Sequence, residues 1–306
     1  MKPAATDLQV LHTVTEFSRF CGLPGPTHPL LTVIDLAATR GQPRPVGLTP
    51  IVQQFYTVWL KKGLKGNIHY GRQSYDFGEG ILGFQAPGQV FAIDETLDLS
   101  EISGWMLLFH PDLLHKHPLG SKILNYSFFS YQVHEALHLS AREEQQLDSV
   151  LTSIRLEHEQ PIDVFSQDVL ISQLEVLLNY ANRFYHRQFL TRRPTEHDLL
   201  SRFETLLTAY FAQSGEQPLP TVQYFADALH VSPAYLSDML RTLTGQTTQQ
   251  HIHYGLIEKA KQLLLSTSLS INETAFQLGF EYPQYFTRLF KNKTGLTPAA
   301  FRLSAQ

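Results

Sequence analysis

The hydrophobic pattern divides the chain into a strand-like first part and a helical remainder. Short apolar runs separated by Gly and Pro occupy residues from about 30 to 110, and five of them follow one another at even spacing. This spacing predicts an antiparallel sandwich or barrel. Two amphipathic helices are predicted within about 140–189, on either side of Pro161. Ser140 and Glu143 have the spacing of a capping box at the start of the first helix.

A longer pattern occurs twice near the C-terminus, as residues 221–248 and 270–298. Ala226 corresponds to Ala275 at an offset of 49 residues, and later matches have an offset of 50. These later pairs are Tyr235 and Tyr285, Thr244 and Thr294, Gly245 and Gly295, and Thr247 and Thr297. The one-residue slip falls just before Tyr235, where a tight turn is expected. Such a repeat is one supersecondary motif that has been duplicated.

Each copy has the start signals of two short helices around a sharp turn. Thr221 and Ser232 are in N-cap positions in the first copy, and Ser232 is followed by Pro at the first helical position. In the second copy Ser270 begins a capping box, and Pro283 begins the second helix. Two helices joined by a turn of three or four residues form a helix-turn-helix. The two predicted units span about 221–245 and 270–295.

Residues Gln249–Thr267 have apolar positions at helical spacing, so one helix is expected to join the two units. This arrangement can place two recognition helices in successive major grooves on one face of DNA, about 34 Å apart.

The segment resembles the C-terminal DNA-binding domain of the AraC/XylS family of bacterial transcription regulators, over residues of about 198–303. The resemblance rests on Ser-Pro-Ala-Tyr-Leu-Ser at 232–237 and on the run from Gly279-Phe280 to Phe301-Arg302. It implies a sequence-specific regulator that binds double-stranded promoter DNA, with RNA polymerase as a partner, and an activator rather than a repressor.

The outward positions of the two recognition helices are the candidate DNA contacts. Arg pairs bidentately with guanine and Gln with adenine, so Arg288 and Gln284 are the strongest candidates, at positions that face the groove in the family. Asp238 can accept a hydrogen bond from cytosine, or it can pair with Arg241 one turn on. The predicted DNA-binding set is Ser232, Ala234, Tyr235, Ser237, Asp238, Arg241, Gln284, Tyr285, Thr287, Arg288 and Lys291.

The charge of this region is not that of a general DNA-binding surface. Residues 195–306 contain eight Lys and Arg and nine Asp and Glu, a net charge of −1. From residue 282 onward, however, four basic residues occur without an acidic one. Binding is therefore expected to depend on a local patch in the second unit and on backbone N–H groups at helix starts. A modest affinity for a single site makes dimerisation important.

The strand-rich part resembles the cupin-like sensor domain that precedes this DNA-binding domain in the family. The features are the aromatic strand Phe55–Leu60, the Pro87-Gly88 turn and the Gly104-Trp105 pair. A small barrel of this kind can hold one small ligand. The candidate effector-binding residues, each of which could equally be core, are Phe55, Trp59, His69, Tyr70, Phe84 and Phe91.

A metal-dependent cupin enzyme needs a His-x-His, a carboxylate and a further His. His115-Lys-His117 is the only candidate in the domain, and no Glu is close to it in the sequence. No metal, cofactor or catalytic residue is therefore predicted. A cupin-type metal enzyme fused to a DNA-binding module, and an architectural DNA-binding protein with a ligand-free barrel, are the alternatives.

The predicted fold is α+β and multidomain, with an antiparallel cupin-like barrel and packed helices followed by an all-α domain. Residues 1–190 are expected to sense an effector and to dimerise, 191–196 to form a linker, and 197–306 to bind DNA. The chain has one cysteine and no apolar run long enough to span a membrane. The N-terminal residues lack the pattern of a signal sequence. The expected protein is a cytoplasmic homodimer.

Overall fold

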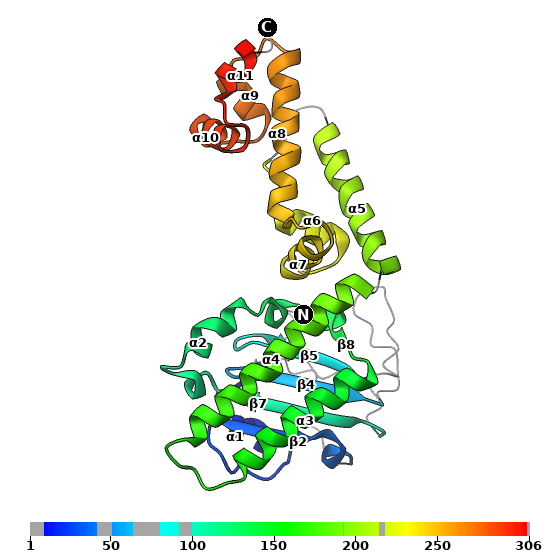
Figure 1. The fold of residues 1–306 in the computed structure, drawn as a ribbon, viewed down its shortest axis with the longest axis vertical. Coiled ribbons are helices and arrows are strands. Elements are labelled where there is room, and N and C mark those ends of the chain that lie inside the picture. Colours follow the sequence, from blue (N-terminus) through cyan, green and yellow to red (C-terminus); the bar gives the residue numbers. More distant parts are fainter. Residues whose placement is uncertain are drawn as a thin grey trace, which may run out of the picture. The chain divides into compact units, whose positions relative to one another are not determined.

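The chain folds into two compact units, Met1–Gln188 and Phe189–Gln306. The computed structural model describes residues 9–41, 51–63, 80–91, 100–191, 193–213 and 218–304. The first unit combines β-sheets with helices, and the second is built from helices (Figure 1).

The larger sheet of the first unit has the strand order β2-β7-β4-β5-β8, and every neighbouring pair in it is antiparallel. Its strands are β2 (Leu31–Asp35), β4 (Tyr56–Lys62), β5 (Ile81–Gln85), β7 (Ser103–Phe109) and β8 (Leu137–His138). Both faces of the central strand β4 are covered by other layers. For this reason its first five residues, Tyr56 to Leu60, are all buried rather than alternating with exposed polar residues.

A smaller sheet lies against one face of the larger one. It contains β1 (Gln9–Leu11), β3 (Ile51–Gln53) and β6 (Val90–Phe91); β1 pairs with β3 in parallel, and β3 with β6 antiparallel. Helix α1 (Val14–Phe20) follows β1 and is capped by the Thr13 side chain. A hydrophobic cluster joins these elements to the larger sheet; it contains Leu11, Val14, Phe17, Ile34, Ile51, Phe55 and Leu108.

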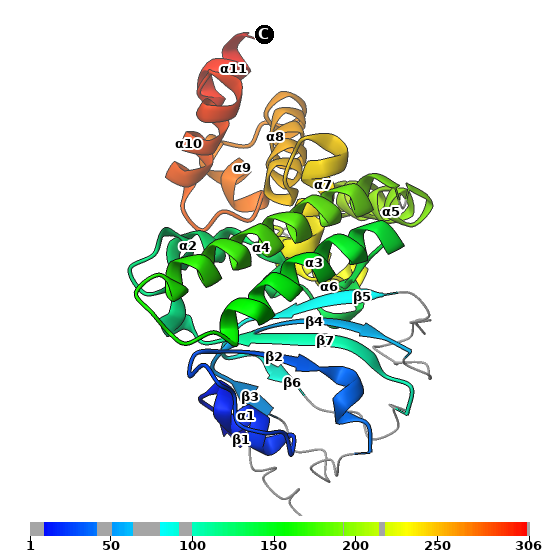
Figure 2. The ribbon, with the colours of Figure 1, turned by 60° about the horizontal axis from the view of Figure 1, so that its bottom comes forward.

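Two long helices, α3 (Ala141–His158) and α4 (Ser166–Thr191), cover the other face of the larger sheet (Figure 2). The Trp105 indole of β7 donates a hydrogen bond to Asp148 of α3 at 2.8 Å. Phe84 of β5 packs near Tyr185 of α4. The short elements of this unit are η1 (Leu36–Thr39), η2 (Pro111–Leu114), α2 (Pro118–Lys122), η3 (Ile123–Asn125), η4 (Ser127–Ser130) and η5 (Val133–Glu135).

The second unit is organised around one long helix, α8 (Thr248–Ser266). Helices α5, α6 and α7 contact it, as do α9 and α11. The bounds of the surrounding helices are α5 (Arg193–Ala212), α6 (Val222–Leu229), α7 (Pro233–Thr244), α9 (Ile271–Gln277), α10 (Pro283–Thr294) and α11 (Pro298–Ser304). Leu256, Ala260 and Leu264 of α8 share a core with Phe286 and Phe290 of α10.

The antiparallel β-domain with packed helices and the helical C-terminal domain confirm the coarse fold prediction. The capping box at Ser140 and Glu143 is also present. The described strands form two separate sheets, and the parallel pairing of β1 with β3 was not predicted. One of the five expected apolar runs, residues 66–77, lies outside the described residues.

The expected linker at 191–196 is mostly helical. Helix α4 ends at Thr191 and α5 begins at Arg193, so the helix expected from 197 starts four residues earlier. Pro194 does not prevent this, because it is the second residue of α5. Backbone N–H groups in the first turn of a helix have no intrahelical partner, and a proline there removes no hydrogen bond.

Gly83 is opposite Trp59 in the β4–β5 register, and a Cβ at this position would overlap the indole ring. We expect Gly83→Ala to lower the free energy of unfolding of the first unit by about 1–3 kcal/mol, because overpacking displaces the ring. Chemical denaturation measures the change. Gly25→Ala is the matched control, since a Cβ there meets no atom within 4 Å. Equal stabilities of the two variants would contradict the packing of Trp59 on Gly83.

Candidate nucleic-acid interface

The second helices of the two repeat copies end with the same hydrogen bonds, although their N-terminal caps differ: the Ser232 side chain caps α7, and Tyr282 makes no side-chain cap at α10. Helices α7 and α10 both end at a glycine in the left-handed region, Gly245 at φ 78° and Gly295 at φ 80°. In both helices the hydroxyl of the last threonine donates to the carbonyl four residues earlier, at 2.8 Å. The following helix is capped by Thr247 in the first copy and begins after Thr297 in the second. The two copies therefore share these terminal hydrogen bonds as well as their sequence pattern.

The turn of each unit also has a common geometry. His230 and Gly279 both have positive φ, 59° and 88°. After each of them, a backbone N–H donates to the carbonyl of the alanine that both copies share: Val231 to Ala226 and Phe280 to Ala275, both at 3.0 Å. The extra residue of the second copy is thus placed after Phe280, before Pro283. Its location in the last part of the turn explains how both units keep the same helix packing.

The two alanines lie where the helices of each unit meet. Ala226 and Ala275 have no exposed surface. Ala275 belongs to the same core as Phe286 and Phe290 of the following helix. A larger side chain at these positions would separate the two helices of the unit.

Helix α10 presents its predicted DNA contacts to solvent. Gln284, Tyr285, Arg288 and Lys291 are exposed, and Thr287 is half-buried. The Arg288 guanidinium lies over the Tyr285 ring at 5.3 Å from its centroid, and Tyr282 contacts the same ring edge-on. Stacking on an aromatic ring restricts the Arg288 side chain before it meets DNA.

Helix α7 differs from α10 although it occupies the same place in its unit. Tyr235 is 7% exposed, whereas the matching Tyr285 is 50% exposed. Asp238 pairs with Arg241 at 3.3 Å, which is the intrahelical alternative, and the Ser237 hydroxyl is 3.1 Å from that of Thr248. These polar groups are engaged within the unit. Of the predicted α7 set, Arg241 is exposed and Ala234 is half-buried, while Ser232 is buried as the N-cap.

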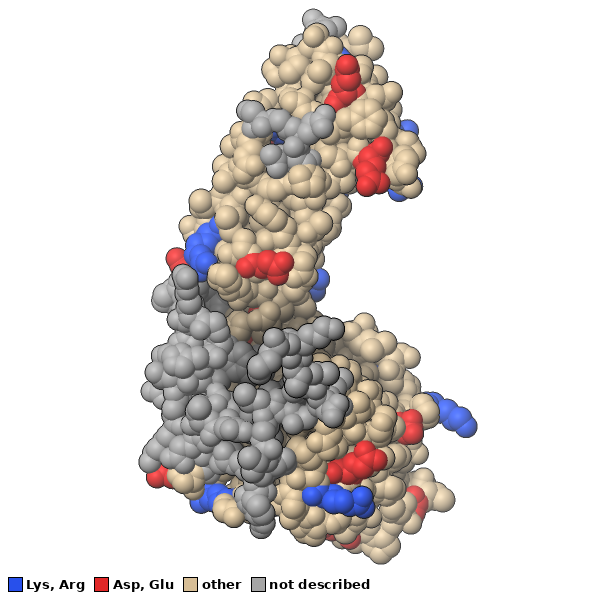
Figure 3. Space-filling view, turned by 180° about the vertical axis from the view of Figure 1, so that it is seen from behind, with Lys and Arg blue, Asp and Glu red and all other residues tan. Residues whose placement is uncertain are grey.

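Two of the four C-terminal basic residues have neighbours inside the unit. Arg302 donates to the carbonyl of Leu264 at 2.9 Å, so it ties α11 to the end of α8. Lys293 is close enough to His253 of α8 to lower the pKa of that imidazole, together with burial, which is the larger cause. On the face of this unit drawn in Figure 3, Lys and Arg are isolated and Asp and Glu lie among them. Arg288, Lys291 and Lys293 are all exposed on α10, and of these Arg288 and Lys291 belong to the predicted DNA-binding set.

The six candidate effector-binding residues do not share one face of the sheet. Phe55 and Trp59 lie between the two sheets, in separate hydrophobic clusters. Phe84 is on the opposite face, stacked among Phe128, Phe129 and Tyr185 under the long helices. The strand register explains the difference, because Phe84 is opposite Val58 rather than Trp59. His69, Tyr70 and the side chain of Phe91 lie outside the described residues.

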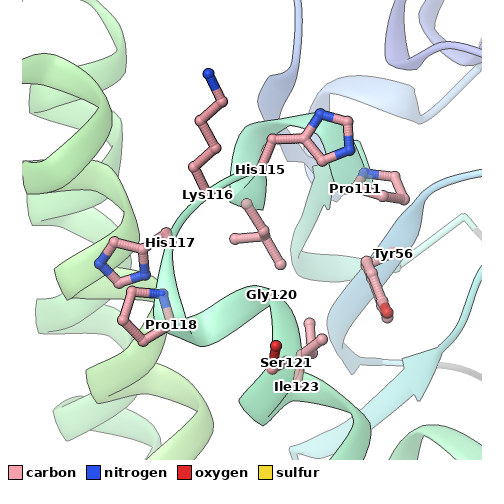
Figure 4. Close-up of a pocket in the computed structure, with 10 residues that line it drawn as sticks. Tyr56, Pro111, His115, Lys116, His117, Pro118, Gly120, Ser121 and Ile123 are labelled. Carbon is pink, nitrogen blue, oxygen red and sulfur yellow. The ribbon is translucent and has the colours of Figure 1, made fainter.

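The His-x-His segment lines an open pocket of about 560 Å³ in the first unit (Figure 4). The His115 and His117 rings point to opposite sides of the chain there. His117 Nδ1 accepts the N–H of Leu119 at 3.1 Å, and His115 Nε2 lies 3.7 Å from Asp112. In the part of the chain that the structure describes, no group of three or more His, Cys, Asp or Glu could hold a metal ion.

Sequence reasoning missed Lys61 and Gln53. The Lys61 ammonium lies 4.5 Å from the centroid of the Trp59 ring, and the Gln53 side chain is buried between the sheets. The alternation Thr57, Trp59, Lys61 is visible in the sequence and puts these side chains on one face. Which face that was could be known only from the register and the position of the helices.

Comparison with known proteins finds the same motif. A family model described as a helix-turn-helix domain matches residues 225–304. The transcriptional activator RhaR of Cronobacter sakazakii is 32% identical over 48% of this chain and 51% of its own. The bifunctional transcriptional activator/DNA repair enzyme AdaA of Bacillus subtilis is 33% identical over 33% of this chain and 48% of its own. The C-terminal domain of AraT from Geobacillus stearothermophilus is 33% identical over 35% of this chain and 84% of that domain, with a TM-score of 0.31.

The geometry defines a double helix-turn-helix DNA-binding domain in the second unit. The second unit has the C-terminal DNA-binding domain of the AraC/XylS type of transcription regulator. The chain spans about half the length of the curated relatives named here. None of the helices in the described residues is long and apolar enough to cross a membrane.

Arg288 is the sharpest test of the interface. We expect Arg288→Ala to cost about 1–3 kcal/mol of specific binding and to relax discrimination at one base pair, because a bidentate contact with guanine is lost. Binding to a set of single-base operator variants measures both effects. Arg288→Lys is the matched control, because it keeps the positive charge but lacks the two parallel N–H donors of the guanidinium. A contact to phosphate would instead leave Arg288→Lys close to the wild type and would weaken Arg288→Ala equally on all sequences.

Proposed function

We propose that this protein is a ligand-responsive activator of transcription that binds promoter DNA as a cytoplasmic homodimer and contacts RNA polymerase. The proposal divides the work between an effector-sensing and dimerising part, residues 1–190, and a DNA-binding part, residues 197–306. The observation that carries it is the exposed recognition face of α10, in a second helix-turn-helix whose turn and terminal glycine match those of the first. Activation rather than repression follows the description of RhaR as an activator.

The predicted DNA contacts are part of this proposal, and the residues of α10 are expected to contribute more to base recognition than those of α7. Gln284, Arg288 and Lys291 are exposed on α10 and are assigned to base edges and phosphates of the major groove. On helix α7 of the first helix-turn-helix, Arg241 is the exposed cation, and its pairing with Asp238 favours a positioning contact over base readout. Most discrimination between DNA sequences is therefore assigned to helix α10 of the second helix-turn-helix.

Dimerisation is supported by apolar surface on the first unit. Ile162, Val164 and Phe165 are exposed in the segment between α3 and α4, and Val169 and Val176 are partly exposed on α4. Contiguous exposed apolar residues indicate an interaction surface. A dimer also provides two copies of α10, which compensates for the weak charge of a single DNA-binding domain.

The first unit is assigned a sensing role without catalysis, in a cupin-like domain whose two sheets face each other. The support is that Trp59 and Lys61 lie between the sheets, whereas His115 and His117 diverge at the surface. The bifunctional relative AdaA combines a regulator with a repair enzyme, so catalysis is tested directly. Metal analysis of the purified protein separates a sensing role from that of a metal enzyme. A transition metal bound at stoichiometric amount would contradict the sensing role without catalysis.

Selection of genomic DNA by the purified protein tests the proposal. We expect a bipartite motif whose half-elements lie about one helical turn apart, because α8 holds two helix-turn-helix units on one chain. The better conserved half should be the one that α10 reads. Repeating the selection at several protein concentrations, with sedimentation at the same concentrations, relates occupancy to dimerisation. Recovery of random sequences at every concentration and at low salt would overturn the proposal.

A further inference from the structure

The N-cap of helix α10 differs from those of α6, α7 and α9, which all have a side-chain cap. In the first copy of the repeat, the Ser232 hydroxyl caps α7 and accepts the N–H of Tyr235 at 3.2 Å. Tyr282 occupies the same position before α10, and its side chain makes no cap. The N–H of Tyr285 donates instead to the backbone carbonyl of Tyr282, at 3.0 Å. A tyrosine therefore stands where a serine is favoured.

Neither capping nor burial accounts for the tyrosine at this position. A residue that cannot cap destabilises the start of a helix, and natural sequences break such a local rule mainly at functional sites. Tyr282 does not fill the core of the unit either, since it is 54% exposed. Its ring meets the Tyr285 ring edge-on, with the centroids 5.9 Å apart. This contact is the interaction that a serine could not make.

The Tyr285 ring links Tyr282 to Arg288. The Arg288 guanidinium lies over this ring, 5.3 Å from its centroid. Because Tyr285 is half exposed, packing inside the unit restrains only part of its ring. Tyr282 adds a neighbour from the residue that precedes the helix. The three side chains therefore form one chain of contacts that ends at the arginine.

The charges of α10 leave the aromatic ring as the group that restrains Arg288. In α7 the matching position is Asp238, which pairs with Arg241 at 3.3 Å. In α10 the same two positions are Arg288 and Lys291, and two cations three residues apart on a helix repel each other. No carboxylate of a described residue forms an ion pair with Arg288. The contact with Tyr285 thus has no electrostatic alternative within the described part of the unit.

We propose that Tyr282 is a positioning residue for Arg288, and that it increases base discrimination by holding the Tyr285 ring against the guanidinium. The inference rests on the proposed function, in which Arg288 pairs with a base. A side chain that is already restrained loses less conformational freedom when it binds, and it keeps its two parallel N–H donors directed at one base edge. Helix α10 lacks a stabilising cap and gains a restrained arginine.

Tyr282→Ser tests the positioning role, because it introduces the capping residue of the first copy. We expect discrimination at the base pair that Arg288 reads to fall about two- to fivefold, the contribution of an exposed cation–π contact. The unfolding temperature should be no lower than that of the wild type, since serine can cap α10. Loss of a residue that only stabilises the fold would lower this temperature instead. Tyr282→Phe is the matched control, because it keeps the ring and should keep wild-type discrimination.

A double-mutant cycle with Arg288→Ala separates positioning from direct contact with DNA. The effect of Tyr282→Ser on discrimination should disappear in the Arg288→Ala background, because Tyr282 acts through the arginine. Equal effects in the two backgrounds would overturn the inference. Wild-type discrimination by Tyr282→Ser would also overturn it, as would a loss in Tyr282→Phe equal to that in Tyr282→Ser.

The measurements use the full chain, the motif recovered by selection of genomic DNA and single-base variants of that motif. Recovery of no motif contradicts the proposed function itself. A recovered motif whose discrimination depends on Arg288 but not on Tyr282 overturns only the positioning role. If Arg288→Ala leaves discrimination unchanged, the assignment of Arg288 to a base is wrong, and the role of Tyr282 is overturned with it.

Discussion

The close approach of two short helices in each half of the second unit is the constraint on which the DNA-binding face depends. A fully buried alanine allows this approach, and a left-handed residue directs the chain back so that a backbone N–H reaches the carbonyl of that alanine. His230 adopts this conformation in the first helix-turn-helix and Gly279 in the second. Histidine is enriched there relative to branched residues, but glycine has the lower steric cost, so the second turn is the less strained of the two.

The sequence predicted the elements of the second unit well because their signals are local. Caps, terminal glycines and the offset of the repeat each involve residues a few positions apart. The contrast between Tyr235 and Tyr285 was not predictable, because the two occupy the same position of the motif and differ in what packs against them. The pairing of Asp238 with Arg241 was one of two alternatives that spacing alone leaves open.

The first unit was predicted less completely, and the reason is the register of its strands. Alternation along β4 divides its residues into two sets, but both faces are buried, so polarity does not identify the inner one. Phe84 was grouped with Trp59 although a shift of one position places it under α4. The early start of α5 has a similar cause, since a proline in the first turn is compatible with both a linker and a helix.

In the proposed function, the weak charge of the DNA-binding domain and effector binding by the first unit are connected through linkage. An effector can shift the protein between two states only by the difference in its affinity for them. On the DNA side, a domain with net charge −1 gains little from non-specific attraction, so its occupancy of DNA depends on specific contacts and, in the proposed homodimer, on the second protomer. In the proposed regulator, a small coupling free energy from the first unit is therefore sufficient to decide whether the operator is occupied.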